Sequence, residues 1–188
     1  MVIIKRVSLP SELAGIKRLQ QANLKSLLPD EEMEREGFVT AEYTLEFLEE
    51  MHRASPSIIA KDEDEVVGYA IATTPSVREN HPLLADLFNV IDSKSYNGRF
   101  LRDTKYIVIG QLCVGKGYRG QGLVQRMYSL FRDQLSGEYD YCLTDVDFKN
   151  PRSLKAHLKS GFAILDTLLY NNAEYHLVIW DWKPKKIS

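Results

Sequence analysis

Residues 115–122 have the composition and spacing of an anion-binding loop. Gly120 and Gly122 follow an apolar run that ends at Val114, and a helical pattern begins at Leu123. Glycines at such a junction let consecutive backbone N–H groups approach an anion, and the positive end of the helix dipole points at the same place. We therefore expect a phosphate or pyrophosphate group to bind here.

Two other phosphate-binding motifs overlap this loop. Residues 110–116 follow the P-loop pattern, but Gly117 stands where the Ser or Thr that holds magnesium should be. Residues 115–120 satisfy G-x-G-x-x-G, with Asp145 or Asp147 at the end of the next strand to hold a ribose. A dinucleotide fold needs successive parallel βα units, whereas an antiparallel hairpin is predicted before this motif. A nucleotide-binding protein remains an alternative.

A second group of polar residues lies on one short helix. Asn150 can cap this helix, Pro151 suits its first position, and Gly161 ends it. At about 100° per residue, Asn150, Ser153 and His157 fall on one face. The sequence therefore predicts three polar side chains that point in one direction.

Together, these motifs resemble those of the GNAT superfamily of N-acetyltransferases. Residues 119–124 are similar to Q/R-x-x-G-x-G/A, with a valine at the usual small position, and residues 150–162 to N-x-x-[SA]-x-x-x-Y-x-x-x-G-F, with His157 replacing the common tyrosine. The resemblance implies one domain over residues 1–188 that transfers an acetyl group from acetyl-CoA to a primary amine of a small molecule or peptide. A non-catalytic acyl-CoA-binding module is the alternative.

The resemblance also implies where acetyl-CoA binds. Backbone N–H groups near Leu112–Val114 would bind the thioester carbonyl and the pantetheine, on a strand that splays from its neighbour. Asn150 and Ser153 would touch the pantetheine arm, and the glycine loop would hold the pyrophosphate. The expected binding residues are Leu112, Cys113, Val114, Arg119, Gly120, Gln121, Gly122, Leu123, Val124, Asn150 and Ser153.

His157 is the expected catalytic residue. The resemblance places it near the thioester sulfur, and a histidine pKa of about 6.5 would let it protonate the departing thiolate. Its contribution would be modest, because a thiol of pKa about 8.5 leaves without much help. The alternative is a histidine that packs against the cosubstrate and transfers no proton.

No general base stands out in the sequence. The strand Tyr106–Val114 contains no carboxylate, although some family members use a glutamate there. Asp145, Asp147 and Glu42 could act through water, and loss of the amine proton to bulk water is an equal alternative.

Composition narrows the classes of partner and location. The chain has 188 residues, 44% of them hydrophobic, and a net charge of −2. That charge favours neither nucleic acid nor an anionic membrane as a partner, and no apolar stretch is long enough to span a membrane. We expect a cytoplasmic protein without a metal site, whose two cysteines, Cys113 and Cys142, are buried as small hydrophobic residues.

The charges are unevenly distributed. Residues 30–50 hold nine acids against one base, Arg35. They either attract a cationic substrate or form a solvated helix face. Lys116, Arg119 and Arg126 lie in and just after the glycine loop, where an anionic cosubstrate would need counter-charge.

The elements that must position these motifs form one mixed sheet flanked by helices, an α/β (α+β) fold. Residues 75–105 are irregular apart from a short helix and could form a lid. Trp180 and Trp182 point the same way, into the core or toward a homodimer surface. Strands are predicted at Val2–Val7, Ser57–Lys61, Val66–Thr73, Tyr106–Val114, Tyr139–Val146, Phe162–Tyr170 and Glu174–Trp182, and helices from Ser8 to Pro29, and at Thr40–His52, Leu83–Ile91, Leu123–Leu135 and Pro151–Ser160.

Overall fold

A mixed sheet forms the centre of the structure, a computed structural model that describes residues 1–29, 31, 33, 37–170 and 172–184. Its strands lie in the order β1-β2-β3-β6-β7-β9-β8, and only β6 and β7 are parallel neighbours within this described part. The strands are β1 (Ile3–Arg6), β2 (Ile58–Asp62), β3 (Glu65–Thr73), β6 (Tyr106–Val114), β7 (Tyr141–Asp147), β8 (Ala163–Tyr170) and β9 (Ala173–Asp181), with a separate hairpin of β4 (Ser95–Tyr96) and β5 (Arg99–Phe100); the helices are α1 (Pro10–Gln21), α3 (Leu45–Ala54), α4 (Pro82–Ser93), α5 (Leu123–Leu135) and α6 (Pro151–Lys159).

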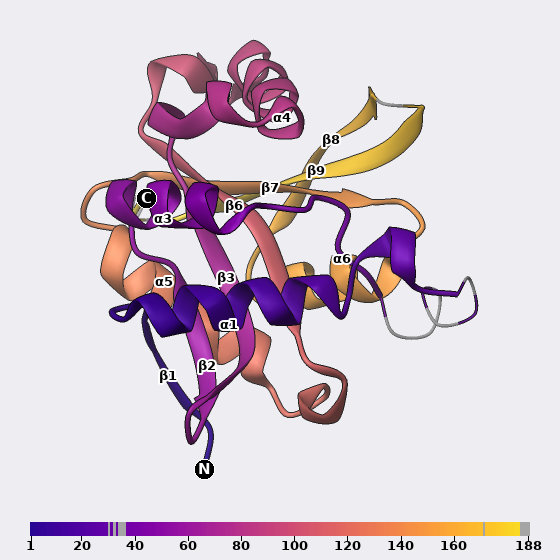
Figure 1. Cartoon of the computed structure of the whole chain (residues 1–188). Coiled ribbons are helices and arrows are strands. Elements are labelled where there is room, and N and C mark those ends of the chain that lie inside the picture. Colours follow the sequence, from indigo (N-terminus) through magenta and orange to yellow (C-terminus); the bar gives the residue numbers. More distant parts are fainter. Residues whose placement is uncertain (30, 32, 34–36, 171, 185–188) are drawn as a thin grey trace.

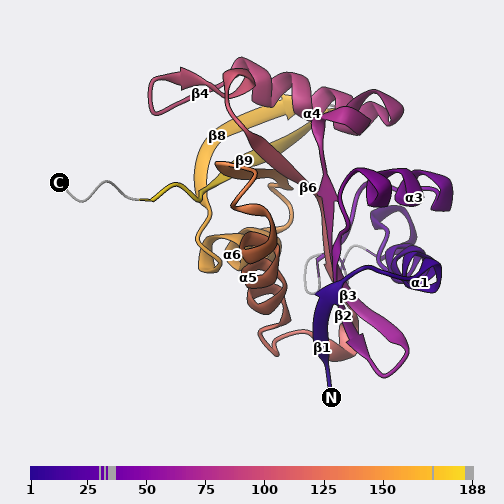
Figure 2. The ribbon, with the colours of Figure 1, turned by 90° about the vertical axis from the view of Figure 1, so that its left-hand side faces the viewer.

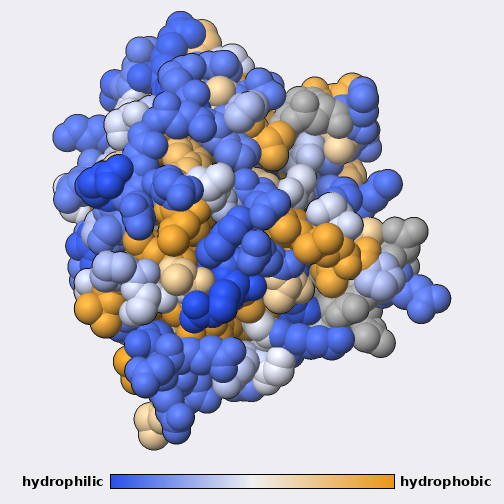
Figure 3. All heavy atoms as spheres, viewed as in Figure 1, coloured by the Kyte–Doolittle hydropathy of each residue, from blue (hydrophilic) through white to orange (hydrophobic). Residues whose placement is uncertain are grey.

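Helices cover both faces of this sheet. Figures 1 and 2 show α1 and α3 on one face, α5 and α6 on the other, and α4 across the end where β6 begins. Side chains of a strand point alternately to the two faces, so Tyr69 and Ile71 of β3 pack with α1, α3 and α4, whereas Ala70 and Ala72 pack with α5. Hydrophilic residues cover most of the face over α1 and α3 (Figure 3). The predicted fold class is confirmed.

Strands β6 and β7 separate partway along their length. They pair only from Tyr106 opposite Tyr141 to Val108 opposite Leu143, although both strands continue beyond that point. The register of β6 against β3 also shifts at Gly110, where a Cβ atom would clash with the Thr73 hydroxyl. The resulting gap confirms the predicted splay.

The first helix differs from its prediction at both ends. Its N-cap is Leu9 and not Ser8, because the Glu12 carboxylate accepts hydrogen bonds from the N–H groups of both residues, at 3.2 and 2.8 Å. The helix ends at Gln21 instead of reaching Pro29. Leu24 continues the helical spacing in sequence, but it lies in a β-bridge with Val39.

The second helix begins later than predicted. Thr44 caps it by accepting a hydrogen bond from the Phe47 N–H, so residues 40–44 precede the helix and are not helical. Of the acidic run, Asp30, Glu32, Glu34, Arg35 and Glu36 lie outside the described residues.

Residues 75–105 are more regular than predicted. Helix α4 buries Leu84, Leu87 and Phe88 against the sheet, and the hairpin of β4 and β5 follows it. Lys94 forms an ion pair of 2.6 Å with Asp166 of β8, which fixes the segment to the outer strand.

Several side chains lie where the sequence predicts. Cys113 and Cys142 are buried, and burial raises the pKa of the Cys113 thiol to about 12. Trp182 is buried, and its ring contacts that of Trp180 at 5.7 Å between centroids. No helix among the described residues is long and apolar enough to cross a membrane.

Candidate active site

A cleft of about 460 Å³ opens at the end of β6, between the glycine loop, the start of α5 and one side of α6. We call it the glycine-loop cleft. Of the predicted binding residues, Gln121 does not line it, because its side chain is exposed and donates to the Gly117 carbonyl at 3.2 Å. The other ten do line it: Leu112, Cys113, Val114, Arg119, Gly120, Gly122, Leu123, Val124, Asn150 and Ser153.

The loop has the backbone shape that an anion site needs. Gly120 and Gly122 have φ angles of +78° and +73°, which side-chain-bearing residues rarely adopt. Gly122 is the N-cap of α5 and provides no capping side chain, so the first N–H groups of that helix are not bonded by the cap residue. A Cβ at either glycine would have no neighbour within 4 Å, so the space beside the loop is open. These features fit a pyrophosphate.

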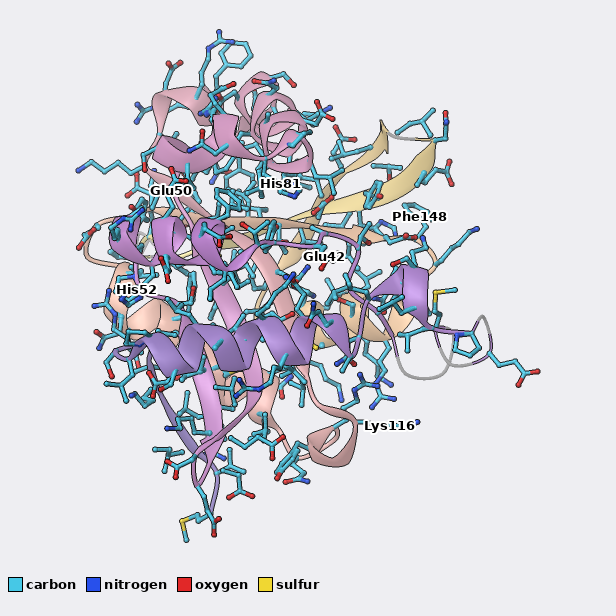
Figure 4. The ribbon with its side chains drawn as sticks, viewed as in Figure 1. Glu42, Glu50, His52, His81, Lys116 and Phe148 are labelled. Atoms are coloured by element: carbon cyan, nitrogen blue, oxygen red, sulfur yellow. The ribbon has the colours of Figure 1, made fainter. Side chains whose placement is uncertain are left out.

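Positive charge also reaches this cleft from α6, a predicted helix whose basic residues were not among the predicted counter-charges. Arg152, Lys155 and Lys159 of α6 line it, at the i, i+3, i+7 spacing of one helix face. Two of the predicted counter-charges do not line it. Arg126 donates instead to the Val2 carbonyl at 2.9 Å, and Lys116 extends outward from the loop after β6 (Figure 4).

Arg119 is held in place at the junction of β6 and the loop. Its Nε donates to the Val114 carbonyl at 2.8 Å, and its Nη2 donates to Asn23 Oδ1 at 2.6 Å. The guanidinium therefore joins the loop to the residues after α1 while lining the cleft.

Two N–H groups of β6 face the gap beside β7. The Gly115 N–H donates to the Val67 carbonyl of β3 at 2.8 Å. Antiparallel ladders bond alternate residues, so the N–H groups of Cys113 and Gln111 also point toward β3. Those of Leu112 and Val114 consequently point into the gap, where the thioester carbonyl was predicted to bind.

A second cavity, of about 100 Å³, lies in this gap. We call it the split pocket. Its walls come from β6, β7, β9, residues 38–41 and 43, and α6 with its cap, including His157. Leu83, just inside α4, is the one side chain that the predicted lid contributes among the described residues. Phe38, Val39, Leu112, Asn150 and Ser153 line both cavities, which therefore meet between the separated strands.

The three predicted carboxylates have different surroundings. Glu42 lies outside both cavities, on the side of α1 and α3 (Figure 4), and its carboxylate is 2.7 Å from Lys17 Nζ. Asp147 lines the split pocket with its charge balanced by Lys25 Nζ at 2.8 Å. Asp145 lines the same pocket.

Tyr43 and Tyr175 line the same pocket as Asp145 and were not predicted from the sequence. Burial, and then the charge of Asp145, raise the phenol pKa of Tyr43 and Tyr175. The Tyr43 hydroxyl donates to the Gly110 carbonyl at 2.9 Å, at the register shift of β6. Neither residue lies near a motif, so only the folded chain brings them together.

A buried hydrogen-bond network holds residues 41–43 against β6. The Gln111 side chain donates to the Ala41 carbonyl at 2.7 Å and accepts from Gln20 and the Tyr69 hydroxyl, at 2.9 and 2.7 Å. Gln20 Oε1 in turn accepts from the Tyr43 N–H at 2.9 Å. These contacts fix the position of one wall of the split pocket.

The Asn150 side chain makes two hydrogen bonds at the junction of the cavities. Its Oδ1 accepts from the Ser153 N–H at 3.2 Å, which confirms it as the cap of α6. Its Nδ2 donates to the Phe38 carbonyl at 3.1 Å. Gly37 adopts a φ of +76°, and a Cβ there would lie 3.0 Å from Asn150 Oδ1.

His157 lines the inner end of the split pocket, and its surroundings favour the packing alternative over a role as an acid. The ring is 2% exposed and packs against Tyr128 and Phe162. Its Nδ1 donates to the Ser153 carbonyl and its Nε2 accepts from the Tyr128 hydroxyl, both at 2.8 Å. Burial lowers its pKa to about 4, so the ring is neutral at pH 7 and both nitrogens are already bonded.

Comparisons with known proteins agree with this geometry. Residues 21–162 match the acetyltransferase (GNAT) family. No curated protein matches the chain. Solved structures share the fold: the NatC complex bound to Gag peptide and CoA (16% identity, TM-score 0.67, 96% of this chain and 98% of that chain) and Arabidopsis thaliana NAA60 with acetyl-CoA (15%, 0.65, 96% and 99%). Another is Salmonella typhimurium yncA with acetyl-CoA (13%, 0.64, 100% and 98%).

Proposed function

The chain belongs to the acetyltransferase (GNAT) family, and from that premise we propose that it transfers an acetyl group from acetyl-CoA to a primary amine of a small molecule or peptide. The observation that carries this proposal is the meeting of two cavities in the gap between β6 and β7. One has the open glycine loop and cations that suit an anionic cosubstrate, and the other is a narrow pocket that reaches the same gap from the face covered by α1 and α3.

Different residues of the glycine-loop cleft would bind different parts of acetyl-CoA. The N–H groups at the start of α5 would hold the pyrophosphate, with Arg152, Lys155 and Lys159 supplying positive charge. Asn150 and Ser153 would contact the pantetheine arm. The N–H groups of Leu112 and Val114 would donate to the thioester carbonyl, where negative charge builds up during transfer.

The reaction also needs proton movements. Overall, acetyl-CoA and an ammonium give an N-acetyl amide, CoA as a thiol and one proton. Asp145 is the carboxylate that we assign to accept the amine proton, directly or through water, because it lines the split pocket and is half-buried, whereas Asp147 is buried. His157 supports α6 and contributes no proton; a thiolate of pKa about 8.5 takes its proton from water.

The test is thiol release from acetyl-CoA by the full chain with a panel of amines, with mass spectrometry of the products. We expect amine-dependent thiol release and a product heavier by one acetyl group. Release no faster than in the absence of amine would contradict the proposal.

Melting temperatures separate the alternatives, because a ligand that binds only the folded chain raises the melting temperature. Stabilisation by acetyl-CoA without turnover would indicate an acyl-CoA-binding module. Stabilisation by NAD or ATP but not by acetyl-CoA would indicate a nucleotide-binding protein.

A further inference from the structure

The side chains of β6 change faces at Gly110. Residues two apart in a regular strand point to the same face. Ile107 and Ile109 belong to the apolar cluster on the face of α5, but Cys113, also at an odd-numbered position, belongs to the cluster on the face of α1 and α3. The register of β6 against β3 shifts at the same place. Gly110 is therefore the extra residue of a β-bulge, which shifts the alternation by one residue.

The bulge also determines which N–H groups of β6 face β7. The Ile109 carbonyl points toward β7, because it accepts a hydrogen bond from the Thr144 hydroxyl at 2.8 Å. In an unbroken strand the next odd-numbered residues would present their N–H and C=O groups to the same side. In the structure they face β3, and the N–H groups of Leu112 and Val114 face the gap. These two donors are thus in place because of the bulge.

Two hydroxyl groups bond the backbone at this point. The Tyr43 hydroxyl, from the segment before α3, donates to the Gly110 carbonyl at 2.9 Å. The Thr144 hydroxyl donates to the carbonyl of the preceding residue, just beyond Val108, where the pairing of β6 with β7 ends. Both side chains are buried. Two adjacent carbonyls are therefore fixed by side chains from two different elements where strand pairing is interrupted.

On the premise of the function above, we propose that Tyr43 and Thr144 are positioning residues for acetyl transfer. Their hydroxyls fix the carbonyls of residues 109 and 110, and with them the bulge that directs the N–H groups of Leu112 and Val114 to the thioester carbonyl. Those N–H groups stabilise the negative charge that forms on the carbonyl oxygen, and this stabilisation depends on distance and alignment. Neither hydroxyl takes part in the proton movements.

Removal of one hydroxyl at a time tests this role by kinetics. In Tyr43→Phe and Thr144→Val the two N–H groups remain but lose their alignment, so we expect kcat to fall about tenfold. The KM for acetyl-CoA should stay unchanged, because the contacts to the pyrophosphate and the pantetheine remain. Thr144→Ser keeps the hydroxyl and should keep most of the wild-type kcat. An equally low kcat in Thr144→Ser and Thr144→Val would overturn the proposal.

Tyr106→Phe is the matched control. The Tyr106 hydroxyl donates to Asp92 at 2.7 Å near the start of β6, and the residue is buried and lines neither cavity. Its loss should lower the melting temperature but leave kcat unchanged. A kcat as low as that of Tyr43→Phe would mean that any loss of stability slows the reaction, and the proposal would fail.

The pH dependence of kcat separates positioning from proton transfer. A positioning role predicts that the profile of Tyr43→Phe is lower than that of the wild type and has the same shape. Loss of one limb of the profile would show that Tyr43 itself accepts the amine proton, and would overturn the proposal.

An infrared measurement keeps this test separate from that of catalysis. Acetyl-CoA with an isotopic label at its thioester carbonyl is bound to the full chain without amine, and the difference from unlabelled acetyl-CoA isolates the carbonyl stretch. Hydrogen bonds to the oxygen lower this frequency, so we expect it to be higher in Tyr43→Phe and Thr144→Val than in the wild type, Thr144→Ser and Tyr106→Phe. If no amine releases thiol, the proposed function fails, but this difference still supports the positioning role. One frequency in all five proteins would overturn it.

Discussion

The two cavities that meet between β6 and β7 are built in different ways. The glycine-loop cleft takes most of its lining from two continuous stretches, residues 112–125 and 150–159. The split pocket takes small groups of residues from β6, β7, β9, α4, α6 with its cap, and the segment before α3. The first cavity depends on local backbone conformation and the second on long-range packing. Substitutions should therefore act locally in the cleft and spread through hydrogen bonds in the pocket.

The largest effect of pH is expected at His157, a motif residue that is buried at the inner end of the split pocket. Its pKa is about 4 in the folded chain against 6.5 for an unperturbed histidine. Between these pH values the unfolded chain binds a proton that the folded chain does not, so stability is lost as the pH falls from 6.5 to 4. This one group accounts for about 3 kcal/mol.

Urea unfolding of the wild type and of His157→Gln across pH 4 to 7 measures this contribution. We expect the free energy of unfolding of the variant to depend less on pH by about that amount. Its kcat at pH 7 should remain within a few fold of the wild type. Parallel stability curves together with a large loss of kcat would restore the role of His157 as an acid.

The next effect is expected at Gly122, where the cleft depends on backbone shape alone. A valine at a φ of +73° stores about 2 kcal/mol of strain, which is relieved by moving the N–H groups that face the cleft. Calorimetry should show acetyl-CoA affinity reduced by about thirtyfold in Gly122→Val. Gly117→Ala is the control, since Gly117 has no positive φ and open space around it. Equal losses in both variants would mean that loop composition matters and not conformation.

A smaller effect on substrate affinity, in the other cavity, is expected from Gln111→Leu. The substitution leaves the buried Ala41 carbonyl, Gln20 amide and Tyr69 hydroxyl each short of a partner, which costs about 1–3 kcal/mol of folding stability for each group. The KM for the amine should rise severalfold, while the KM for acetyl-CoA should stay the same.

Gln134→Leu is the control for that prediction, because Gln134 is exposed on α5 and lines neither cavity. Steady-state kinetics with each substrate varied in turn give both KM values. If Gln111→Leu raised both KM values equally, the two cavities would not be separable in the way described above.

The smallest effect is expected from Lys155→Ala. A single solvated charge beside the cleft contributes about 0.5–1 kcal/mol, so the KM for acetyl-CoA should rise two- to fivefold, and the difference should shrink as salt is added. Lys149→Ala removes a nearby charge that does not line the cleft and should leave KM unchanged. An effect that is insensitive to salt would point to packing of the lysine stem instead of its charge.

The parts of the fold that sequence predicted well are those with local signals. Pro151 and Asn150 mark the start of α6, and the polar residues after Asp62 mark the hairpin between β2 and β3. The end of α1 was misjudged because the apolar spacing of Leu24 suits a helix as well as a bridge to a distant strand residue. Sequence spacing alone does not show whether an apolar residue continues a helix or pairs with a distant residue.

The same limit applies to the site. Glycine positions predict a loop conformation directly, so the lining of the cleft was largely foreseen. The residues of one helix face are predicted equally well, but the direction in which that face points is not. His157 points inward to the split pocket, Ser153 lines both cavities, and Arg152, Lys155 and Lys159 line the cleft. Tyr43 lies in the segment before α3 and Tyr175 lies in β9, and no sequence pattern links the two positions.

The short pairing of β6 with β7 also divides the amide hydrogens of one strand into two sets. Those of Gln111 and Cys113 are bonded to β3, whereas those of Leu112 and Val114 face the gap. In deuterated water the second set should exchange faster than the first, and a bound thioester carbonyl should slow it. Alternate residues of β6 thus record, through their exchange rates, whether the gap is filled.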